Sequence, residues 1–227
     1  MITDMAGAVQ AGLRQEHKME TISNHLANVN TAGFKAGILT FDEMLRERMT
    51  LDLSQGDINA TGNPLDLALA DKGFFKIQTP AGIRYTRNGN FSLNSDHRLV
   101  TSEGYAVLGD NGPLMIDGSD ISVNEQGEIR VDGETAGNLA VVDVKYPAKL
   151  QKEGASHFRY TGPAAEEIIV PQRVSVRQGH LERSNVTTVV EMVKMIDGMR
   201  TYESYQKMIQ AIDETDAKAV NEVGKLG

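Results

Sequence analysis

Hydrophobic residues near the start of the chain recur at the spacing of a helix. Over residues 2–30, apolar positions follow one another mostly three or four residues apart. This spacing predicts one amphipathic helix with a narrow apolar stripe. Asn30, Thr31 and Gly33 follow the last periodic positions, and these residue types are typical of a helix end and the turn after it.

The helical spacing returns at the other end of the chain. From about residue 182 onward, apolar residues again lie mostly three or four positions apart, which predicts a helix over residues 185–223. Ser184 or Asn185 could serve as its N-cap, because their side chains can accept hydrogen bonds from free amides of the first turn. Proline does not interrupt the stretch, and Gly198 weakens it only locally.

Between the two periodic ends, turn signals come at short intervals. Four Asn-Gly or Asp-Gly dipeptides separate short runs of β-forming residues, a pattern that predicts an all-β domain of hairpins. The dipeptides are Asn88-Gly89, Asn111-Gly112, Asp117-Gly118 and Asp132-Gly133. The β-forming runs cover residues 74–77, 84–87, 105–108 and 139–144.

This layout predicts an α+β protein in which the terminal helices pair as a coiled coil and a β domain is inserted between them. The expected parts are an N-terminal helix (1–35), a linker or short helix (36–60), a β-rich outer domain (61–180) and a C-terminal helix (181–227). An alternative fold lays both helices over one face of the β domain. The helices are long for one small domain, so part of each apolar stripe would need another partner.

The predicted seam of the coiled coil takes the apolar residues at three- and four-residue spacing. We expect these side chains to form core within one subunit and between subunits. They are Ile2, Met5, Val9, Met19, Ile22, Leu26, Val189, Val193, Ile196, Met199, Tyr202, Ile209 and Ile212.

Composition excludes several classes of function. The 227 residues carry a net charge of −8 and no cysteine, so thiolate metal sites and cysteine nucleophiles are excluded. An acidic chain lacks the electrostatic footprint of a nucleic-acid binder. No apolar run is long enough to span a bilayer, and the N-terminus has no secretory-signal pattern. We therefore expect no nucleic-acid partner, no membrane insertion and no cleaved signal peptide.

The candidate chemistry is sparse. His17 and His25 lie eight residues apart and suggest solvated surface positions better than a metal site. The acidic turns near Asp110 and Asp117 lack the spacing of a calcium loop. Asp66 stands in an apolar run, where a carboxylate could have a perturbed pKa. The favoured interpretation is a structural one, with Asp66 binding backbone amides at a bend after Pro64. The sequence thus predicts no catalytic residue, no metal and no cofactor.

Five segments, in order, resemble the signature segments of the flagellar basal-body rod and hook proteins. The first is Leu26-Ala27-Asn28-Val29-Asn30-Thr31-Ala32-Gly33-Phe34-Lys35, and the last lies where the second helix is expected to begin. The motif residues that the resemblance marks for assembly are Ala27, Asn28, Thr31, Gly33, Phe34, Lys35, Thr61, Gly62, Asn63, Pro64, Leu65, Asp66, Gly73, Phe74, Phe75, Tyr85, Thr86, Arg87, Gly89, Phe91, Gly104, Gly109, Leu181, Glu182, Ser184, Asn185 and Val186.

The resemblance implies a structural subunit of the flagellar rod that transmits motor torque. Its partners would be other rod proteins, copies of itself and the flagellar type III export apparatus, and its place the rod within the periplasm. Proximal-rod members are the most similar, because only residues 36–60 separate the first two motifs where distal-rod members carry a longer insertion. A distal-rod subunit is the alternative within the family.

Two other classes of function are alternatives to a rod subunit. An enzyme that cuts peptidoglycan would need a pair of acidic residues in a cleft, and the sequence shows no such isolated pair. A surface adhesin or a phage-tail-like structural protein could use the same plan of helices and β domain. Localisation separates that alternative from a rod subunit.

Overall fold

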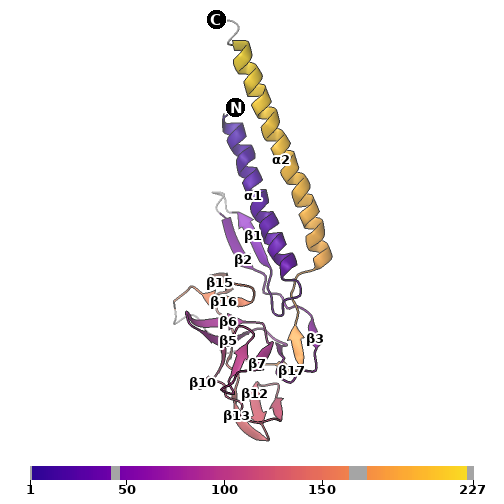
Figure 1. Cartoon of the computed structure of the whole chain (residues 1–227). Helices are drawn as coiled ribbons and strands as arrows, with labels where there is room; N and C mark the ends of the chain where they lie inside the picture. The colour runs from indigo at the N-terminus through magenta and orange to yellow at the C-terminus, as the bar shows by residue number, and fades with distance from the viewer. Residues whose placement is uncertain (1, 42–46, 164–172, 224–227) are drawn as a thin grey trace. The chain divides into compact units, whose positions relative to one another are not determined.

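The computed structural model describes residues 2–41, 47–163 and 173–223. The chain folds as two compact units. The helical unit contains Met1–Ala27 and Thr187–Gly227, and the β unit contains Asn28–Val186. Figure 1 shows the two helices and the strands of the β unit. The α+β class and the central position of the β-rich region in the sequence are as predicted.

Two helices form the helical unit. They are α1 (Ile2–Ala27) and α2 (Thr188–Val223), which lie side by side and antiparallel (Figure 1). Both helices were predicted. α1 ends before the predicted residue 30, because the chain turns at Asn28, where Thr31 donates its backbone N–H to the Asn28 carbonyl at 3.1 Å.

In the β unit, every strand pairing within the described residues is antiparallel. The largest sheet has the order β15-β16-β6-β5-β9-β8-β7, with β10 on β9 and β14 on β5. Its strands are β5 (Phe74–Thr79), β6 (Gly82–Thr86), β7 (Phe91–Leu93), β8 (Leu99–Thr101), β9 (Ala106–Gly109), β10 (Gly112–Pro113), β14 (Val141–Val142), β15 (Leu150–Glu153) and β16 (His157–Tyr160).

Smaller sheets complete this unit. A three-stranded meander contains β11 (Ile121–Val123), β12 (Glu128–Val131) and β13 (Glu134–Asn138). Two two-stranded pairs bring the late part of the unit back to its start: β17 (Val176–Gln178) on β4 (Leu67–Leu69), and β18 (His180–Glu182) on β3 (Ile58–Ala60). The 3₁₀ helix η1 (Pro147–Lys149) precedes β15.

One predicted hairpin turn has the expected backbone. Asp132 and Gly133 connect β12 to β13 with φ of 51° and 88°. Two consecutive positive φ angles are the signature of a type I′ turn, which suits the twist of an antiparallel pair. The Asp-Gly pattern therefore located this hairpin correctly.

A linker or short helix was predicted for residues 36–60. The described residues of this range contain strands and no helix. Here β1 (Gly37–Phe41) pairs with β2 (Glu47–Leu51), and β3 follows. Residues 42–46, part of the predicted helical stretch, lie outside the described residues. The strands form because each half finds a partner in register, for example Leu39 opposite Met49. Such pairing is a cross-strand property that helical spacing in one segment does not reveal.

Two cores lie on opposite faces of β5. Successive residues of a strand point to opposite sides, so Phe74 and Phe75 enter different clusters. The Phe74 ring packs edge-on against Phe158 with centroids 5.5 Å apart. The Phe75 ring packs in the same way against Phe91 at 5.2 Å. The Gly-Phe-Phe motif thus joins two hydrophobic clusters across one sheet.

Candidate functional site: a buried polar junction

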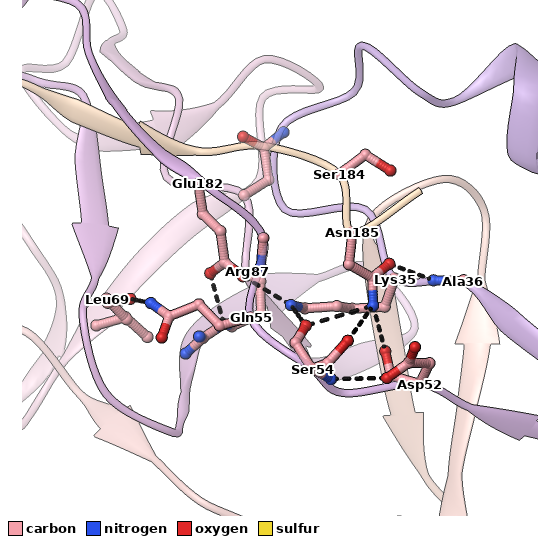
Figure 2. Close-up of polar contacts among 12 residues, drawn as sticks. Lys35, Ala36, Asp52, Ser54, Gln55, Leu69, Arg87, Glu182, Ser184 and Asn185 are labelled. Atoms are coloured by element: carbon pink, nitrogen blue, oxygen red, sulfur yellow. Dashed lines mark hydrogen bonds and ion pairs between the residues drawn. The ribbon is translucent and has the colours of Figure 1, made fainter. Parts of the chain in front are cut away.

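Three segments that are distant in sequence meet in the β unit. The Gly33 N–H donates to the Glu182 carbonyl at 2.8 Å, and the Asp52 N–H donates to the Ala36 carbonyl at 2.8 Å. The Arg183 N–H in turn donates to the Asp57 carbonyl at 2.8 Å. The chain leaving α1, the chain returning to α2 and the loop between β2 and β3 are therefore bonded together. We call this place the junction; Figure 2 shows its polar contacts.

A single carboxylate lies at the centre of the junction. Glu182 is 1% exposed, and its Oε1 accepts hydrogen bonds from Lys35 Nζ at 2.6 Å and from the Gly56 N–H at 3.0 Å. Arg87 Nε lies 2.9 Å from Glu182 Oε2. A buried charge is tolerated when it is paired and hydrogen-bonded, and Glu182 has two cationic neighbours and one amide donor.

Both cations are anchored a second time by backbone carbonyls. Lys35 Nζ also donates to the Ser54 carbonyl at 2.5 Å. Arg87 Nη1 donates to the carbonyls of Asp71 and Gly73, both at 2.8 Å. Through its two cations, the Glu182 carboxylate is thus connected to two stretches of backbone, one at Ser54 and one at Asp71 and Gly73.

Burial sets the electrostatics of the two cations. Desolvation lowers the pKa of Lys35 below its ordinary value, although the Glu182 carboxylate raises it, and the nearby Arg87 adds to the lowering. Desolvation likewise lowers the pKa of the Arg87 guanidinium, again opposed by Glu182. Each cation therefore depends on the carboxylate to remain charged in the interior.

Asn185 connects the same segments through hydrogen bonds of its side-chain amide. Its Oδ1 accepts from the Ala36 N–H at 2.9 Å, and its Nδ2 donates to the Asp52 carbonyl at 2.9 Å. The predicted N-cap role is wrong for Ser184 and Asn185, since α2 begins only at Thr188. The Asn185 amide is fully used by the junction, and Ser184 Oγ accepts from the Val186 N–H at 3.2 Å.

Gly33 is required at its position for two reasons. Its φ of +65° lies in the left-handed region, which disfavours a side chain. A Cβ atom there would also lie 2.3 Å from the Arg87 carbonyl carbon and the Asn88 nitrogen. The motif glycine thus permits close contact between the chain leaving α1 and the strand end that carries Arg87.

The neighbouring Phe34 is buried beneath a lysine. Lys152 Nζ lies 3.2 Å from the centroid of the Phe34 ring and donates to the Lys35 carbonyl at 3.1 Å. Burial lowers the pKa of Lys152 to about 8. The aromatic face attracts the charged form of the amine, so β15 is held to the motif segment by a cation and by a hydrogen bond.

Asp66 forms a second polar centre in the β unit. Its carboxylate accepts from Thr61 Oγ1 at 2.7 Å, Asn90 Nδ2 at 2.9 Å and Asn63 Nδ2 at 3.3 Å. The structural role was predicted, but the expected backbone-amide donors are wrong: the donors are side chains. Asp66 is buried where the chain bends, and Asn90 comes from a distant segment that sequence spacing could not identify.

The remaining motif residues are distributed through the β unit. Thr86 Oγ1 donates to the Ser156 carbonyl at 2.8 Å, and Tyr85 is buried beside Phe74 and Phe158. Gly89 approaches the Leu67 carbonyl oxygen so closely that a Cβ would lie 1.6 Å from it. Gly73 takes part in the junction through its carbonyl, which accepts from Arg87. Those that the structure places in strands, turns or core without a role in the junction are Gly62, Pro64, Leu65, Phe75, Phe91, Gly104, Gly109, Leu181 and Val186.

Two residues that matter in the helical unit were missed or misjudged. His25 was expected to be solvated, yet it is buried and its Nδ1 lies 3.0 Å from Glu191 Oε2 on the facing helix. Glu191 was not singled out. Neither residue belongs to the predicted seam, and only the packing of α1 on α2 shows that the two meet.

The part of the chain that the structure describes contains no group of three His, Cys, Asp or Glu residues placed to hold a metal ion. Among the same residues, no helix is long and apolar enough to cross a membrane. Glu182 Oε1 and the Asp66 carboxylate accept hydrogen bonds from their neighbours, whereas the buried Glu182 Oε2 has the Arg87 cation beside it and no hydrogen bond. The arrangement of these groups serves to join chain segments.

Comparison with known proteins identifies the class. Three family models match: "Flagella basal body rod protein" over residues 8–35, "Flagellar hook protein FlgE/F/G D1 domain" over 68–131, and "Flagellar basal body rod FlgEFG protein C-terminal" over 177–222. The matches begin in α1, continue through the β unit and end in α2. They define a protein of the flagellar rod and hook class.

Full-length relatives give the family. The flagellar basal-body rod protein FlgF of Caulobacter vibrioides is 31% identical over 98% of this chain and 100% of its own length. FlgG of Bacillus subtilis is 30% identical over 97% of this chain and 99% of its own length. FlgF of Rhizobium meliloti is 29% identical, with 99% of both chains covered. This chain belongs to the flagellar basal-body rod protein family.

Proposed function

We propose that this chain is a structural subunit of the flagellar basal-body rod, of the proximal, FlgF-like type. The single observation that carries the proposal is the full-length match to FlgF, which includes both terminal helices and the β unit. A rod subunit is a structural protein, so the chain is not an enzyme.

The rod transmits torque, and the junction suits that task. A subunit under torque must keep the chain segments next to its helices from shifting within the β unit. The Glu182 pairs with Lys35 and Arg87, together with the Asn185 bonds, hold those segments by side chains buried from water. We propose that the motif residues named above act through this rigidity and through packing, with no catalytic role.

The helices would assemble with copies of this chain and with other rod proteins. Our proposal includes pairing of α1 and α2 as a coiled coil, with apolar side chains left outside the pair to contact neighbouring subunits. Rod-like growth uses two different patches on each subunit, so that assembly continues until another protein stops it. Export through the flagellar type III apparatus and placement of the rod in the periplasm belong to the same proposal.

A distal-rod, FlgG-like subunit is the second candidate. It is favoured by the coverage of the Bacillus subtilis FlgG match, which spans nearly all of both chains. The adhesin and phage-tail alternatives receive no comparable support.

The test is quantitative mass spectrometry of purified hook–basal bodies, combined with deletion of the gene. A rod subunit should be present in the basal body, and its loss should abolish swimming until the gene is restored. Few copies per basal body support the proximal rod, and many support the distal rod. Absence from intact basal bodies would refute the rod assignment.

A further inference from the structure

Helix α2 carries two lengthwise rows of mainly apolar residues, which differ in how far they are exposed to solvent. The inner row repeats at alternating spacings of four and three residues, and its members are buried or partly buried. They are Glu191, Met195, Gly198, Tyr202, Tyr205, Ile209 and Ile212. The outer row contains residues of the predicted seam that are about half exposed or more: Val189 (69%), Val193 (54%), Ile196 (51%) and Met199 (49%).

Contacts with α1 show that the inner row faces it in one register. A Cβ on Gly198 would lie 3.1 Å from Met19 Cγ, and a Cβ on Gly12 would lie 4.0 Å from Tyr205 Cβ. His25 contacts Glu191 at 3.0 Å. The residue numbers of the facing pairs add to 217, 217 and 216, so all three contacts describe one antiparallel alignment.

Hydrophobicity alone does not explain this choice of face. The inner row contains a carboxylate and a glycine, whereas the four outer-row residues are all apolar. Removing apolar area from water is favourable in proportion to the area. Packing the outer row on α1 would therefore bury more apolar surface near the start of α2 than the observed arrangement does.

The His25–Glu191 pair explains why the inner row of α2, and not the outer row, packs on α1. His25 and Glu191 are 7% and 5% exposed, and Lys194 Nζ donates to the other carboxylate oxygen of Glu191 at 2.6 Å. If the outer row faced α1, His25 would be covered by apolar side chains without the Glu191 carboxylate. An uncompensated buried polar group is costly, and this cost falls only on the alternative face.

We propose that the His25–Glu191 pair selects the face of α2 that packs on α1, and thereby keeps the outer row exposed. The pair is a specificity-determining contact. Buried polar residues in coiled coils set register and partner in the same way, at some cost in stability. For a rod subunit, and here the inference rests on the proposed function, the benefit is an apolar row that remains available to a neighbouring rod subunit.

Paired cysteines test the choice of face, because the chain contains no cysteine of its own. The inner reporter combines Gly12→Cys with Tyr205→Cys, whose 4.0 Å Cβ separation fits a disulfide. The outer reporter keeps Gly12→Cys and adds Glu203→Cys, which stands seven residues after Ile196 and continues the outer row. The rates of disulfide formation are compared in the full-length chain.

With His25 and Glu191 present, we expect the inner reporter to oxidise at least about tenfold faster than the outer one. In the His25→Leu/Glu191→Leu double variant we expect the ratio to fall to about threefold or less, because an apolar replacement removes the discrimination without leaving a buried charge. Equal rates in the unsubstituted background would overturn the proposal. An unchanged ratio in the double variant would also overturn it.

Two controls keep the result interpretable. Asp197→Leu adds an apolar side chain at an exposed position of α2 and should leave the ratio unchanged. His25→Leu alone tests the same point if the double variant does not fold, and it should also lower the ratio; a full inner preference in His25→Leu would overturn the proposal. These rates are measured without rod assembly, so failure here is distinguishable from failure of the rod assignment, which the basal-body experiment decides.

Discussion

Glu182 Oε1 lies 2.6 Å from Lys35 Nζ, although 147 positions separate the two residues along the chain. One residue comes shortly after α1 and the other shortly before α2. Their contact closes the β unit at the place where the chain enters and leaves it.

Removal of the central carboxylate should destabilise the β unit strongly. Glu182→Ala leaves the buried cations Lys35 and Arg87 without their counter-ion, and breaking such a pair costs about 3–5 kcal/mol in unfolding free energy. Urea unfolding monitored by a signal from the β unit measures the loss. Arg183→Ala, at the adjacent exposed position, should change stability by less than about 0.5 kcal/mol. Similar effects of the two substitutions would refute the central role of Glu182.

Asn185 acts as a bridge between segments, and substitution distinguishes this from helix capping. Asn185→Ala should cost about 1–3 kcal/mol, because the Ala36 N–H and the Asp52 carbonyl lose their partner. Asn185→Ser retains a good capping side chain but is too short to make both bonds. We therefore expect the serine variant to be nearly as unstable as the alanine variant. Full rescue by serine in thermal unfolding would favour the capping role.

Alanine substitutions at two glycines distinguish the cost of a left-handed backbone from the cost of a steric clash. Gly33 and Gly62 both have positive φ, but a Cβ on Gly62 would meet no atom within 4 Å. Gly62→Ala should cost about 1–2 kcal/mol for the left-handed backbone alone. Gly33→Ala adds the clash with Arg87 and Asn88, so it should be clearly more destabilising in denaturant titrations. Equal losses would show that the close contact at Gly33 relaxes without cost.

The lowered pKa of Lys152 should make the free energy of unfolding rise with pH. Burial lowers its pKa from 10.5 to about 8 in the folded protein. Between these values the unfolded chain binds more protons, so stability rises with pH. Below pH 8 the buried charged amine lowers the free energy of unfolding by its full amount, and above pH 10.5 this loss of stability is gone.

The measurement compares the unsubstituted chain with Lys152→Met from pH 7 upward. The difference in unfolding free energy should shift in favour of the lysine protein as pH rises through this window. Lys72→Met, at an exposed position, gives the background for loss of a lysine. A pH-independent difference for Lys152→Met would mean that the Phe34 ring fully offsets the effect of burial.

Local patterns predicted the elements of this fold better than their contacts. The three- and four-residue spacing located both helices, because one side of a helix must be apolar to pack. The Asp132-Gly133 turn was identified because its backbone needs two residues that tolerate positive φ. The strands β1 and β2 were missed, because their stability comes from pairing with each other, which the spacing within either segment does not reveal.

The sequence by itself determined the order of helix, β unit and helix, the family resemblance and the residues of the motifs, since all of these depend on neighbours in the chain. Tertiary structure alone decided that Lys35 and Arg87 share the Glu182 carboxylate, and that His25 is buried against Glu191 and not solvated. It also decided which apolar row of α2 faces α1. These outcomes depend on the balance between desolvation and pairing at sites built from distant segments, and no local pattern contains that balance.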